Sequence, residues 1–406
     1  MSSFWNLLRR WNSVINPPTQ PKTNDALRFG ILGAANIAPP ALIAPARSHP
    51  EVIIQAVAAR DQIRATAFAK KHGIPDVKPN YQAIIDDPNI DCVYIPLPNG
   101  LHYEWAIKAL NAGKHVLLEK PAVSNAQEAQ QLFNLPILQQ AGAPVILEAF
   151  HYRFQPCWQL FLSLLDQKNI EHAVSSAYIP WFVFKADDIR FRYGLAGGAM
   201  MDLGTYCINT LRQAFGAEAT ECLEAEFKTM PAPEQNAEHA WNAKWQMPNG
   251  GVAESGGGLR VGLGQVGLPR IKVSHKQVKV NDATIAEGQE KFQRRQVEMV
   301  NFMMGAFWHR IDIQDEFVIK DAATGETLKG WVEKSSQKAY TFQEANLEGV
   351  GADWWPTYRH QLEQFVNRIK GRKTNCWVDG EDSIAQAAMI DMTYEKGGLP
   401  LRASPE

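Results

Sequence analysis

The stretch "LLEKPAVS", residues 117–124, places a lysine where chemistry is possible. Apolar residues typical of a buried parallel strand end at Glu119, Lys120 and Pro121. The carboxyl ends of the strands in a doubly wound sheet open onto the crevice that binds ligands. A lysine there can hydrogen-bond a ribose hydroxyl and a substrate oxygen, and its charge favours a developing alkoxide. We therefore predict that Lys120 is catalytic, with a solvated strand-end cation as the alternative.

A second group with possible chemistry lies in "GGAMMDLGTY", residues 197–206. On a helix, Asp202 and Tyr206 are four residues apart and share one face. A phenol with a pKa near 10 is a poor general base at neutral pH, but a nearby ammonium such as Lys120 would lower that pKa. We predict that Tyr206 is an acid/base group tuned by Lys120 and that Asp202 positions substrate hydroxyls. The alternative is a core tyrosine capped by Asp202.

A dinucleotide-binding turn is predicted where the first strand, residues 27–32, runs into "GAANIA". The expected fingerprint is G-x-G-x-x-G/A between a strand and a helix. Ala35 stands in place of the second glycine, so the match is degenerate, and an α/β domain without a ligand is the alternative. Small residues still let the backbone approach a pyrophosphate. The predicted cofactor contacts here are Gly33, Ala34, Ala35, Asn36 and Ile37.

The end of the second strand, residues 52–59, predicts which cofactor is used. NAD sites usually carry Asp or Glu there to hold the ribose 2′-hydroxyl. This chain has Arg60, with Arg64 one helical turn later, and two guanidiniums suit a 2′-phosphate. Asp61 leaves a displaced ribose contact open. We favour NADP over NAD.

Alternating strand and helix patterns to about residue 149 predict the element order that positions these groups. Runs that are apolar on both faces are typical of a parallel sheet covered on both sides. The helix ends "KKHG" and "NAG" carry C-terminal glycines, and Ser124 with Gln127 forms an S-x-x-Q capping box for the next helix. After residue 150, alternating runs such as 270–280 indicate antiparallel strands. The predicted fold is a doubly wound α/β domain followed by an α+β domain with a mostly antiparallel, open-faced sheet.

We divide the chain into four predicted segments: an extension (1–26), a dinucleotide-binding domain (27–149), a substrate-binding and dimerisation domain (150–375) and a C-terminal segment (376–406) whose helix packs on the first domain. In the extension, Phe4, Leu7, Leu8 and Trp11 recur at helical spacing before a Pro-rich linker. We expect this amphipathic helix to dock on the protein or on a partner chain. A membrane-surface or targeting role is less favoured.

Composition excludes several classes of partner. A net charge of −2 argues against a nucleic-acid surface, which needs a concentrated basic patch. No apolar run approaches the roughly 18 residues needed for stable membrane insertion. The five cysteines are scattered and form no CxxC pair, which indicates a reducing, cytoplasmic setting without a disulfide framework or a metal site.

Four motifs in order carry a family resemblance: "PNGLHYEWA", "EKP", "EAFHYRFQP" and "GGAMMDLGTYCIN". Together they resemble the glucose–fructose oxidoreductase / inositol dehydrogenase family over residues 27–400. The branch of dimeric dihydrodiol dehydrogenases and NADP-dependent D-xylose dehydrogenases is the most similar, since many other members have histidine in place of Tyr206. The resemblance implies that Lys120 lies beside the nicotinamide ribose and the reacting carbon. The further implied cofactor contacts are Pro98, Asn99, His102 and Glu119.

For three residues expected near Lys120, the sequence leaves two interpretations open. His102 either lines the nicotinamide pocket or supports it, and Glu119 pairs with Lys120 or with a neighbouring loop. His151 is a substrate contact or a satisfied polar residue. Arg153 and Phe154 complete the candidate substrate contacts, and Arg190 is a further candidate.

The leading hypothesis is an NADP-dependent dehydrogenase of a cyclic polyol, with an aldose such as D-xylose as the favoured substrate. One alternative is a trans-dihydrodiol dehydrogenase, which would need a flatter, more apolar slot. A non-catalytic NADP-binding regulatory protein is an alternative of another class, and reduction of a C=C or C=N bond is a third. Because an uncovered sheet face must be buried and relatives pair their sheets, we expect a homodimer.

Overall fold

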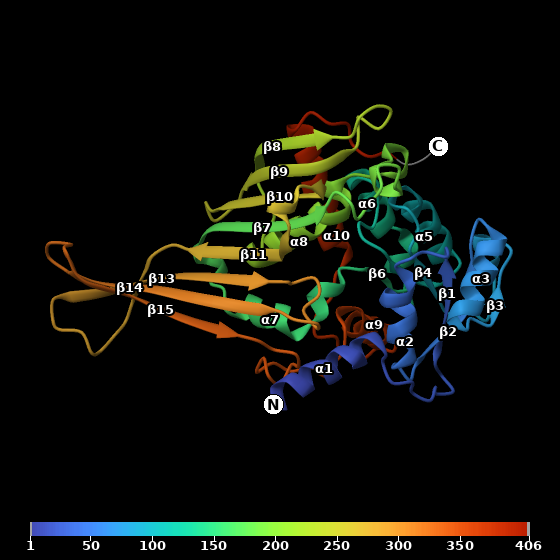
Figure 1. Ribbon diagram of the computed structural model, residues 1–406, viewed down its shortest axis with the longest axis horizontal. Helices are drawn as coiled ribbons and strands as arrows, with labels where there is room; N and C mark the ends of the chain where they lie inside the picture. Colours follow the sequence, from blue (N-terminus) through green and yellow to red (C-terminus); the bar gives the residue numbers. More distant parts are fainter. Residues whose placement is uncertain (1, 404–406) are drawn as a thin grey trace.

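The computed structural model describes residues 2–403, with side chains from residue 8 onward, and it contains two sheets side by side (Figure 1). The first sheet is six-stranded and entirely parallel, in the order β3-β2-β1-β4-β5-β6. Its strands are β1 (Leu27–Leu32), β2 (Val52–Ala58), β3 (Asp76–Val77), β4 (Cys92–Ile95), β5 (His115–Leu118) and β6 (Ile146–Glu148). The predicted doubly wound domain is confirmed.

Helices connect these strands and cover the parallel sheet (Figure 1). They are α2 (Ala44–Arg47), α3 (Gln62–His72), α4 (Tyr81–Ile85), α5 (His102–Asn111) and α6 (Ala126–Phe133). The predicted end of α3 is confirmed, because Gly73 adopts the left-handed conformation at φ 69°. The predicted capping box of α6 is wrong by one residue. Asn125, not Ser124, is the cap, and its side chain accepts a hydrogen bond from the N–H of Glu128.

The second sheet has nine strands in the order β15-β14-β13-β11-β7-β10-β9-β8, with β12 paired to β13. Among the described residues its ladders are antiparallel except the parallel pair β7–β10, so the mostly antiparallel prediction is confirmed. The strands are β7 (Ile170–Pro180), β8 (Glu221–Thr229), β9 (Glu238–Gln246), β10 (Val252–Val261), β11 (Gly267–His275), β12 (Val278–Val280), β13 (Gln289–Val300), β14 (Arg310–Asp321) and β15 (Thr327–Gln337).

One face of this second sheet is covered and the other is open. Helix α8 (Thr205–Phe215) packs against β7, β10 and β11, and its residues are buried almost throughout. Helix α7 (Pro156–Ser163) leads into β7. On the opposite face, side chains such as Glu224, Glu226 and Lys228 of β8 are exposed. Strands β13 to β15 extend as a long ribbon away from the rest of the molecule (Figure 1).

The N-terminal helix α1 (Ser2–Ile15) lies against the second domain. The indole Nε1 of Trp11 donates to the carbonyl oxygen of Phe307 at 2.6 Å. The guanidinium of Arg10 sits 3.4 Å from the ring centroid of Tyr340, close enough for a cation–π contact. Val14 is buried. No helix within residues 2–403 has the length and apolar character needed to cross a membrane.

Two C-terminal helices join the two domains. Helix α9 (Thr357–Ile369) packs on α2 and on the short turn His151–Phe154 at the domain junction. Helix α10 (Gly380–Lys396) packs between α6 of the first domain and α8 and β8 of the second. A carboxylate oxygen of Asp391 on α10 accepts a hydrogen bond from the N–H of Ala126 at 2.7 Å. We call these contacts of α9 and α10 with both domains the domain seam. The domain seam holds the motif residues of the two domains close together.

Candidate functional site

Lys120 lies just beyond the carboxyl end of β5 and reaches into the second domain. Its Nζ donates to the backbone oxygen and to Oδ1 of Asp202, both at 2.9 Å. The same Nζ lies 4.7 Å from the ring centroid of Tyr206. The Lys120–Pro121 peptide bond is cis. The fold therefore brings together the three residues predicted to be catalytic, although they come from different domains.

Asp202 is held between two cations. Its second oxygen, Oδ2, accepts from Nε of Arg190 at 3.0 Å. Burial alone would raise the pKa of this carboxyl, but the charges of Lys120 and Arg190 outweigh burial, and the pKa lies below its usual value. Asp202 is therefore ionised at neutral pH and fixes the position of the Lys120 ammonium.

A π-helical turn, η8 (Met200–Gly204), carries Asp202 into the site. Oε1 of the buried Glu238 accepts from the N–H of Met200 at 2.8 Å, and Nε of Arg402 donates to the oxygen of Gly197 at 2.6 Å. Gly198 has φ 141°, and a Cβ there would collide with the Glu238 carboxylate. The buried Glu238–Arg402 pair thus anchors the segment before α8. The prediction of one regular helix overlooked this widened turn, which is frequent at functional sites.

The hydroxyl of Tyr206 is hydrogen-bonded to His151, whereas the Lys120 ammonium lies over the Tyr206 ring. The hydroxyl lies 2.9 Å from Nε2 of His151, and the ring packs edge-on against Phe150 at a centroid distance of 6.0 Å. Burial raises the pKa of Tyr206 well above its usual value, and the neighbouring Tyr358 and Glu119 raise it further. The prediction that Lys120 lowers this pKa is wrong, because the ammonium lies over the ring face and burial dominates. Tyr206 is consequently protonated at neutral pH and suited to donate a proton.

His151 connects Tyr206 to α9. Its Nδ1 lies 2.7 Å from Oγ1 of Thr357, and its ring packs at a tilt against that of Tyr358, with the ring centroids 4.0 Å apart. Burial, with a smaller contribution from the Lys120 charge, lowers the pKa of His151 to about 3, so the imidazole is neutral. Sequence reasoning missed Thr357 and Tyr358. The available signal was Pro356 followed by a helical stretch, since proline favours helix starts.

Two predicted substrate contacts lie elsewhere. Arg153 is buried, forms an ion pair with Asp382 of α10 and donates to the oxygen of Trp377 at 3.2 Å. Phe154 is 1% exposed and belongs to the hydrophobic core. Both predictions are therefore wrong, because these side chains build the domain seam. Arg190, the further candidate, does reach the site through Asp202.

The residues that the resemblance placed around the nicotinamide form a supporting network. The ring of His102 is buried between the carbonyl oxygens of Pro121 and Leu97, each 2.8 Å from a ring nitrogen. Burial lowers its pKa to about 4. His102 therefore supports the loop that carries Lys120, which is the second of its two interpretations.

Glu119 and Asn99, two further members of that set, hydrogen-bond to other parts of the fold. Oε1 of Glu119 accepts from the hydroxyl of Tyr94 at 2.6 Å, a partner on β4 that neither interpretation had named. Asn99, which follows Pro98, donates from Nδ2 to the oxygen of Ala196 at 3.1 Å and links the two domains.

The turn after β1 leaves backbone donors free. Gly33 has φ 107°, and its N–H donates to the oxygen of Ala58 at 2.7 Å. The next four N–H groups, from Ala34 to Ile37, have no acceptor among residues 2–403. Asn36 and Ile37 are exposed. Since backbone N–H groups rarely stay unpaired, this turn fits the pyrophosphate of a dinucleotide despite the degenerate fingerprint.

Two guanidiniums border this turn. Arg60 is exposed two residues after the end of β2, and Nη2 of the exposed Arg64 donates to the oxygen of Ala34 at 2.9 Å. The carboxylate of Asp61 accepts from the N–H of Arg64 at 3.1 Å, so Asp61 serves as the N-cap of α3. At the end of β2, the exposed side chains of Arg60 and Arg64 would therefore present positive charge to a ribose substituent.

The carboxyl of Glu148, at the end of β6, makes the stability of the loop after Lys120 depend on pH. It is 1% exposed, and its Oε1 accepts from the N–H of Ala122 at 2.9 Å. Burial raises its pKa to about 7. The folded state therefore binds this proton more tightly than the unfolded state, and the stability contributed by Glu148 falls as the pH rises towards 7.

Glu148→Gln mimics the protonated acid and is expected to remove this dependence. Between pH 5 and pH 8, the free energy of unfolding of the wild type should fall by about 2–3 kcal/mol relative to that of the variant. Urea denaturation across this range measures the difference. Glu287→Gln, in an exposed loop, is the control. Parallel pH curves for the wild type and Glu148→Gln would contradict the expectation.

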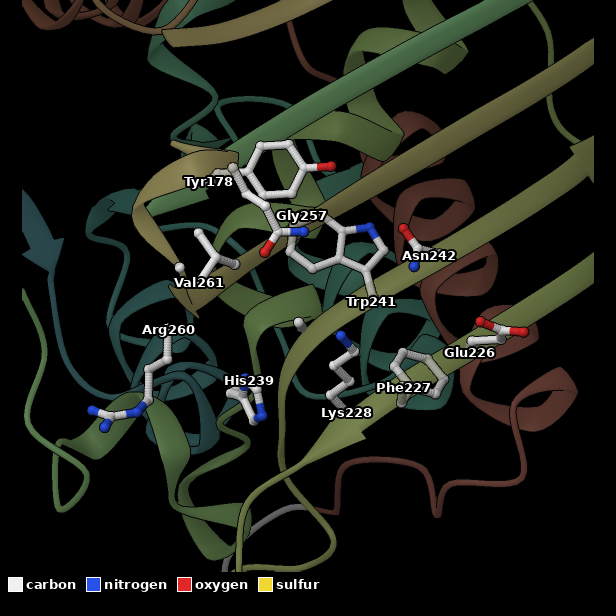
Figure 2. A pocket seen from close by; sticks show the side chains of 13 residues that line it. Tyr178, Glu226, Phe227, Lys228, His239, Trp241, Asn242, Gly257, Arg260 and Val261 are labelled. Carbon is white, nitrogen blue, oxygen red and sulfur yellow. The ribbon is translucent and has the colours of Figure 1, made fainter. Parts of the chain in front are cut away.

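A cavity of about 610 Å³ lies apart from these residues, on the open face of the second sheet. Figure 2 shows its aromatic side chains, including Tyr178 and Trp241, and its basic side chains, including His239 and Arg260. None of the residues predicted for the site lines it. Within the described part of the chain, no group of three or more His, Cys, Asp or Glu side chains is arranged to hold a metal ion.

Known proteins resemble parts of this chain in sequence, and solved structures resemble it in fold. Residues 27–146 match an oxidoreductase family with an NAD-binding Rossmann fold. A D-xylose 1-dehydrogenase (NADP(+)) of Haloferax volcanii is 39% identical over 191 residues, which are 47% of this chain and 58% of that protein. A trans-1,2-dihydrobenzene-1,2-diol dehydrogenase of Xenopus tropicalis is 32% identical over 219 residues, 50% of this chain and 60% of that protein. The chain thus matches somewhat more than half the length of these relatives.

Solved structures match nearly the whole chain. A 3-ketoreductase from Actinomadura kijaniata, in complex with NADP and TDP-benzene, has a TM-score of 0.66 and 23% identity over 90% of this chain and 96% of its own. An aldose-aldose oxidoreductase from Caulobacter crescentus has a TM-score of 0.66 and 18% identity over 92% of this chain and 98% of its own. At this identity the likeness establishes the fold. Over residues 27–146 the chain is also similar in sequence to an oxidoreductase family with an NAD-binding Rossmann fold.

Proposed function

We propose that this chain is an NADP-dependent dehydrogenase that acts on a CH–OH group of a cyclic polyol. The observation that carries the proposal is the cluster at the domain junction, where the Lys120 ammonium, the Asp202 carboxylate and the Tyr206 ring come within contact distance. A non-catalytic NADP-binding protein has no need of a partly buried ammonium beside a protonated phenol. The regulatory alternative is therefore disfavoured.

Different residues of the chain would bind the cofactor, stabilise charge and transfer the proton. The bound nicotinamide would supply the hydride chemistry. The free N–H groups from Ala34 to Ile37 would hold the pyrophosphate, and Arg60 and Arg64 would meet a 2′-phosphate. Lys120, fixed by Asp202, would stabilise negative charge on the substrate oxygen. Tyr206 would donate a proton to that oxygen in the reduction direction and take it back in the oxidation direction.

The polar groups at the site favour an aldose such as D-xylose. Asp202 and Arg190 present hydrogen-bonding groups that a sugar's hydroxyls can use. Arg153, which was predicted as a substrate contact, is paired with Asp382 and does not contribute. The relative from Haloferax volcanii is named for D-xylose and NADP(+), which agrees with this choice.

A trans-dihydrodiol is the second candidate, because apolar side chains follow β7 close to Arg190. Trp181 and Phe182 are 55% and 59% exposed, and Phe184 lies under the Arg190 guanidinium at 4.2 Å. The largely apolar ring of a dihydrodiol would pack well against such aromatic faces. The two classes are separated by measuring turnover with aldoses, inositols and dihydrodiols in the presence of NADP. Cofactor binding without turnover of any of them would overturn the proposal of an enzyme.

Arg60→Ala is expected to raise the KM for NADP about tenfold and to leave the KM for NAD within twofold. The loss corresponds to one charge-assisted hydrogen bond to the 2′-phosphate. A substitution of Arg60 is easier to interpret than one of Arg64, because Arg64 also donates a hydrogen bond to the Ala34 oxygen. Lys70→Ala, an exposed cation farther along α3, is the matched control. Equal effects on NAD and NADP would contradict a 2′-phosphate contact.

We also propose a homodimer formed through the open face of the nine-stranded sheet. Alternate side chains of β8 are exposed there, and the cavity of Figure 2 lies on the same face. Pairing two such faces would cover both. Sedimentation at micromolar concentration should give twice the mass of the chain, and a single-chain mass would contradict the dimer.

A further inference from the structure

The side chains behind Tyr206 form a buried chain of hydrogen bonds. The Tyr206 hydroxyl, both ring nitrogens of His151 and the Thr357 hydroxyl are linked at 2.9 Å and 2.7 Å. His151 is 2% exposed and Thr357 is 3% exposed. These are the only hydrogen bonds that either side chain makes within residues 2–403. The imidazole is thus committed to the one phenol at the centre of the site.

The neutrality of His151 limits how the protons are arranged. One ring nitrogen carries hydrogen and the other accepts. If Nδ1 carries it, Nε2 accepts from the Tyr206 hydroxyl, and the phenol proton faces the histidine. If Nε2 carries it, Nε2–H donates to the phenol oxygen, Thr357 donates to Nδ1, and the phenol proton is free to face a substrate. Transfer of the phenol proton to His151 would create a buried cation beside Lys120, which burial disfavours.

We propose that Thr357 and His151 are positioning residues that hold Tyr206 as a proton donor through the second arrangement. The inference rests on the proposed function, because it assigns the proton transfer to Tyr206. In reduction, the Tyr206 O–H bond breaks and a bond forms between that proton and the substrate oxygen. The phenolate that remains accepts the Nε2–H of His151. A hydrogen bond to a charged acceptor stabilises the phenolate more than the phenol, so His151 favours the transfer.

The position of the hydrogen on His151 can be measured without turnover. Nitrogen-15 NMR of histidine-labelled protein distinguishes a protonated Nε2 from a protonated Nδ1, and His151→Gln identifies the signal. The expected result is hydrogen on Nε2 in the wild type. Hydrogen on Nδ1 would overturn the proposal, because the phenol proton would then be bound to the imidazole.

Matched variants test the effect on the reaction. In polyol oxidation, Tyr206 must first lose its proton, so the rate rises with pH. Thr357→Val and His151→Leu should each move this rise to higher pH, His151→Leu by about one pH unit, with a roughly tenfold loss of kcat at pH 7 and little change in KM. Thr357→Ser keeps the hydroxyl and should restore the wild-type profile. His151→Gln keeps a donor at the position of Nε2 and should restore most of it.

A merely structural role for these residues would lower the rate equally at every pH. If Thr357→Val and His151→Leu leave the pH profile unmoved while Tyr206→Phe is inactive, the inference fails and the proposed function stands. If Tyr206→Phe keeps normal turnover, the proposed function fails instead. Thr357→Val is nearly isosteric with the wild type, so the test holds even where His151→Leu does not fold.

Discussion

Lys120→Met is expected to lower kcat by about 10³-fold, with a smaller change in the KM of the polyol. Removing one preorganised donor to a developing oxyanion typically costs 10²–10³-fold in rate. Lys120 is 11% exposed and sits against the Asp202 carboxylate, so water replaces its charge poorly. Steady-state kinetics with NADP and the best substrate of the panel measure the loss.

The control for this variant is Lys108→Met. Lys108 is an exposed cation on α5 that pairs with Glu104 one turn away and lies outside the site. Its loss should leave kcat within twofold. Near-normal turnover of Lys120→Met would contradict the role of this lysine, whatever the effect on stability.

Tyr206→Phe is expected to lower kcat by about 10²–10⁴-fold, the usual contribution of a positioned proton donor. The ring and its edge-on contact with Phe150 remain, so cofactor binding should be retained. The variant should also unfold more easily by about 1–3 kcal/mol, because the buried Nε2 of His151 loses its partner. Kinetics and urea denaturation measure the two effects separately.

Tyr152→Phe is the matched control for Tyr206→Phe. The Tyr152 hydroxyl donates to Oδ1 of Asn209 at 2.7 Å, and its ring lies 6.0 Å from that of Tyr206. It therefore loses a buried hydrogen bond of the same kind without losing a proton donor. A similar fall in stability with nearly unchanged kcat is expected. If both variants lose activity equally, Tyr206 acts through packing and not through its proton.

The first domain could be predicted closely because local signals specify it. The run Leu27–Leu32 is mostly apolar and is followed by Gly33, and the strand has those bounds. Gly73 marks the end of α3 in the sequence and in the structure. The cap of α6 was misplaced because Ser124 and Asn125 are both good caps, and local sequence does not decide between neighbours.

The composition of the site was harder to predict, because burial and distant contacts decide it. The motifs placed Lys120, Asp202 and Tyr206 near one another, but the pKa of Tyr206 depends on how deeply the ring is buried. Arg153 was expected at the substrate because its motif lies at the junction. Its partner, Asp382, is far away in sequence, and only the packing of α10 shows that it binds there.

Direct transfer of isotope tests the central claim, that hydride moves between NADP(H) and a polyol carbon at the Lys120–Asp202–Tyr206 cluster. A substrate from the panel carries deuterium on the carbon that bears the reacting hydroxyl, and the nicotinamide product is analysed by mass spectrometry. We expect deuterium in the reduced cofactor with the wild-type protein, and transfer about 10³-fold slower with Lys120→Met. Reduced cofactor without deuterium, or equal transfer by Lys120→Met, would contradict the account.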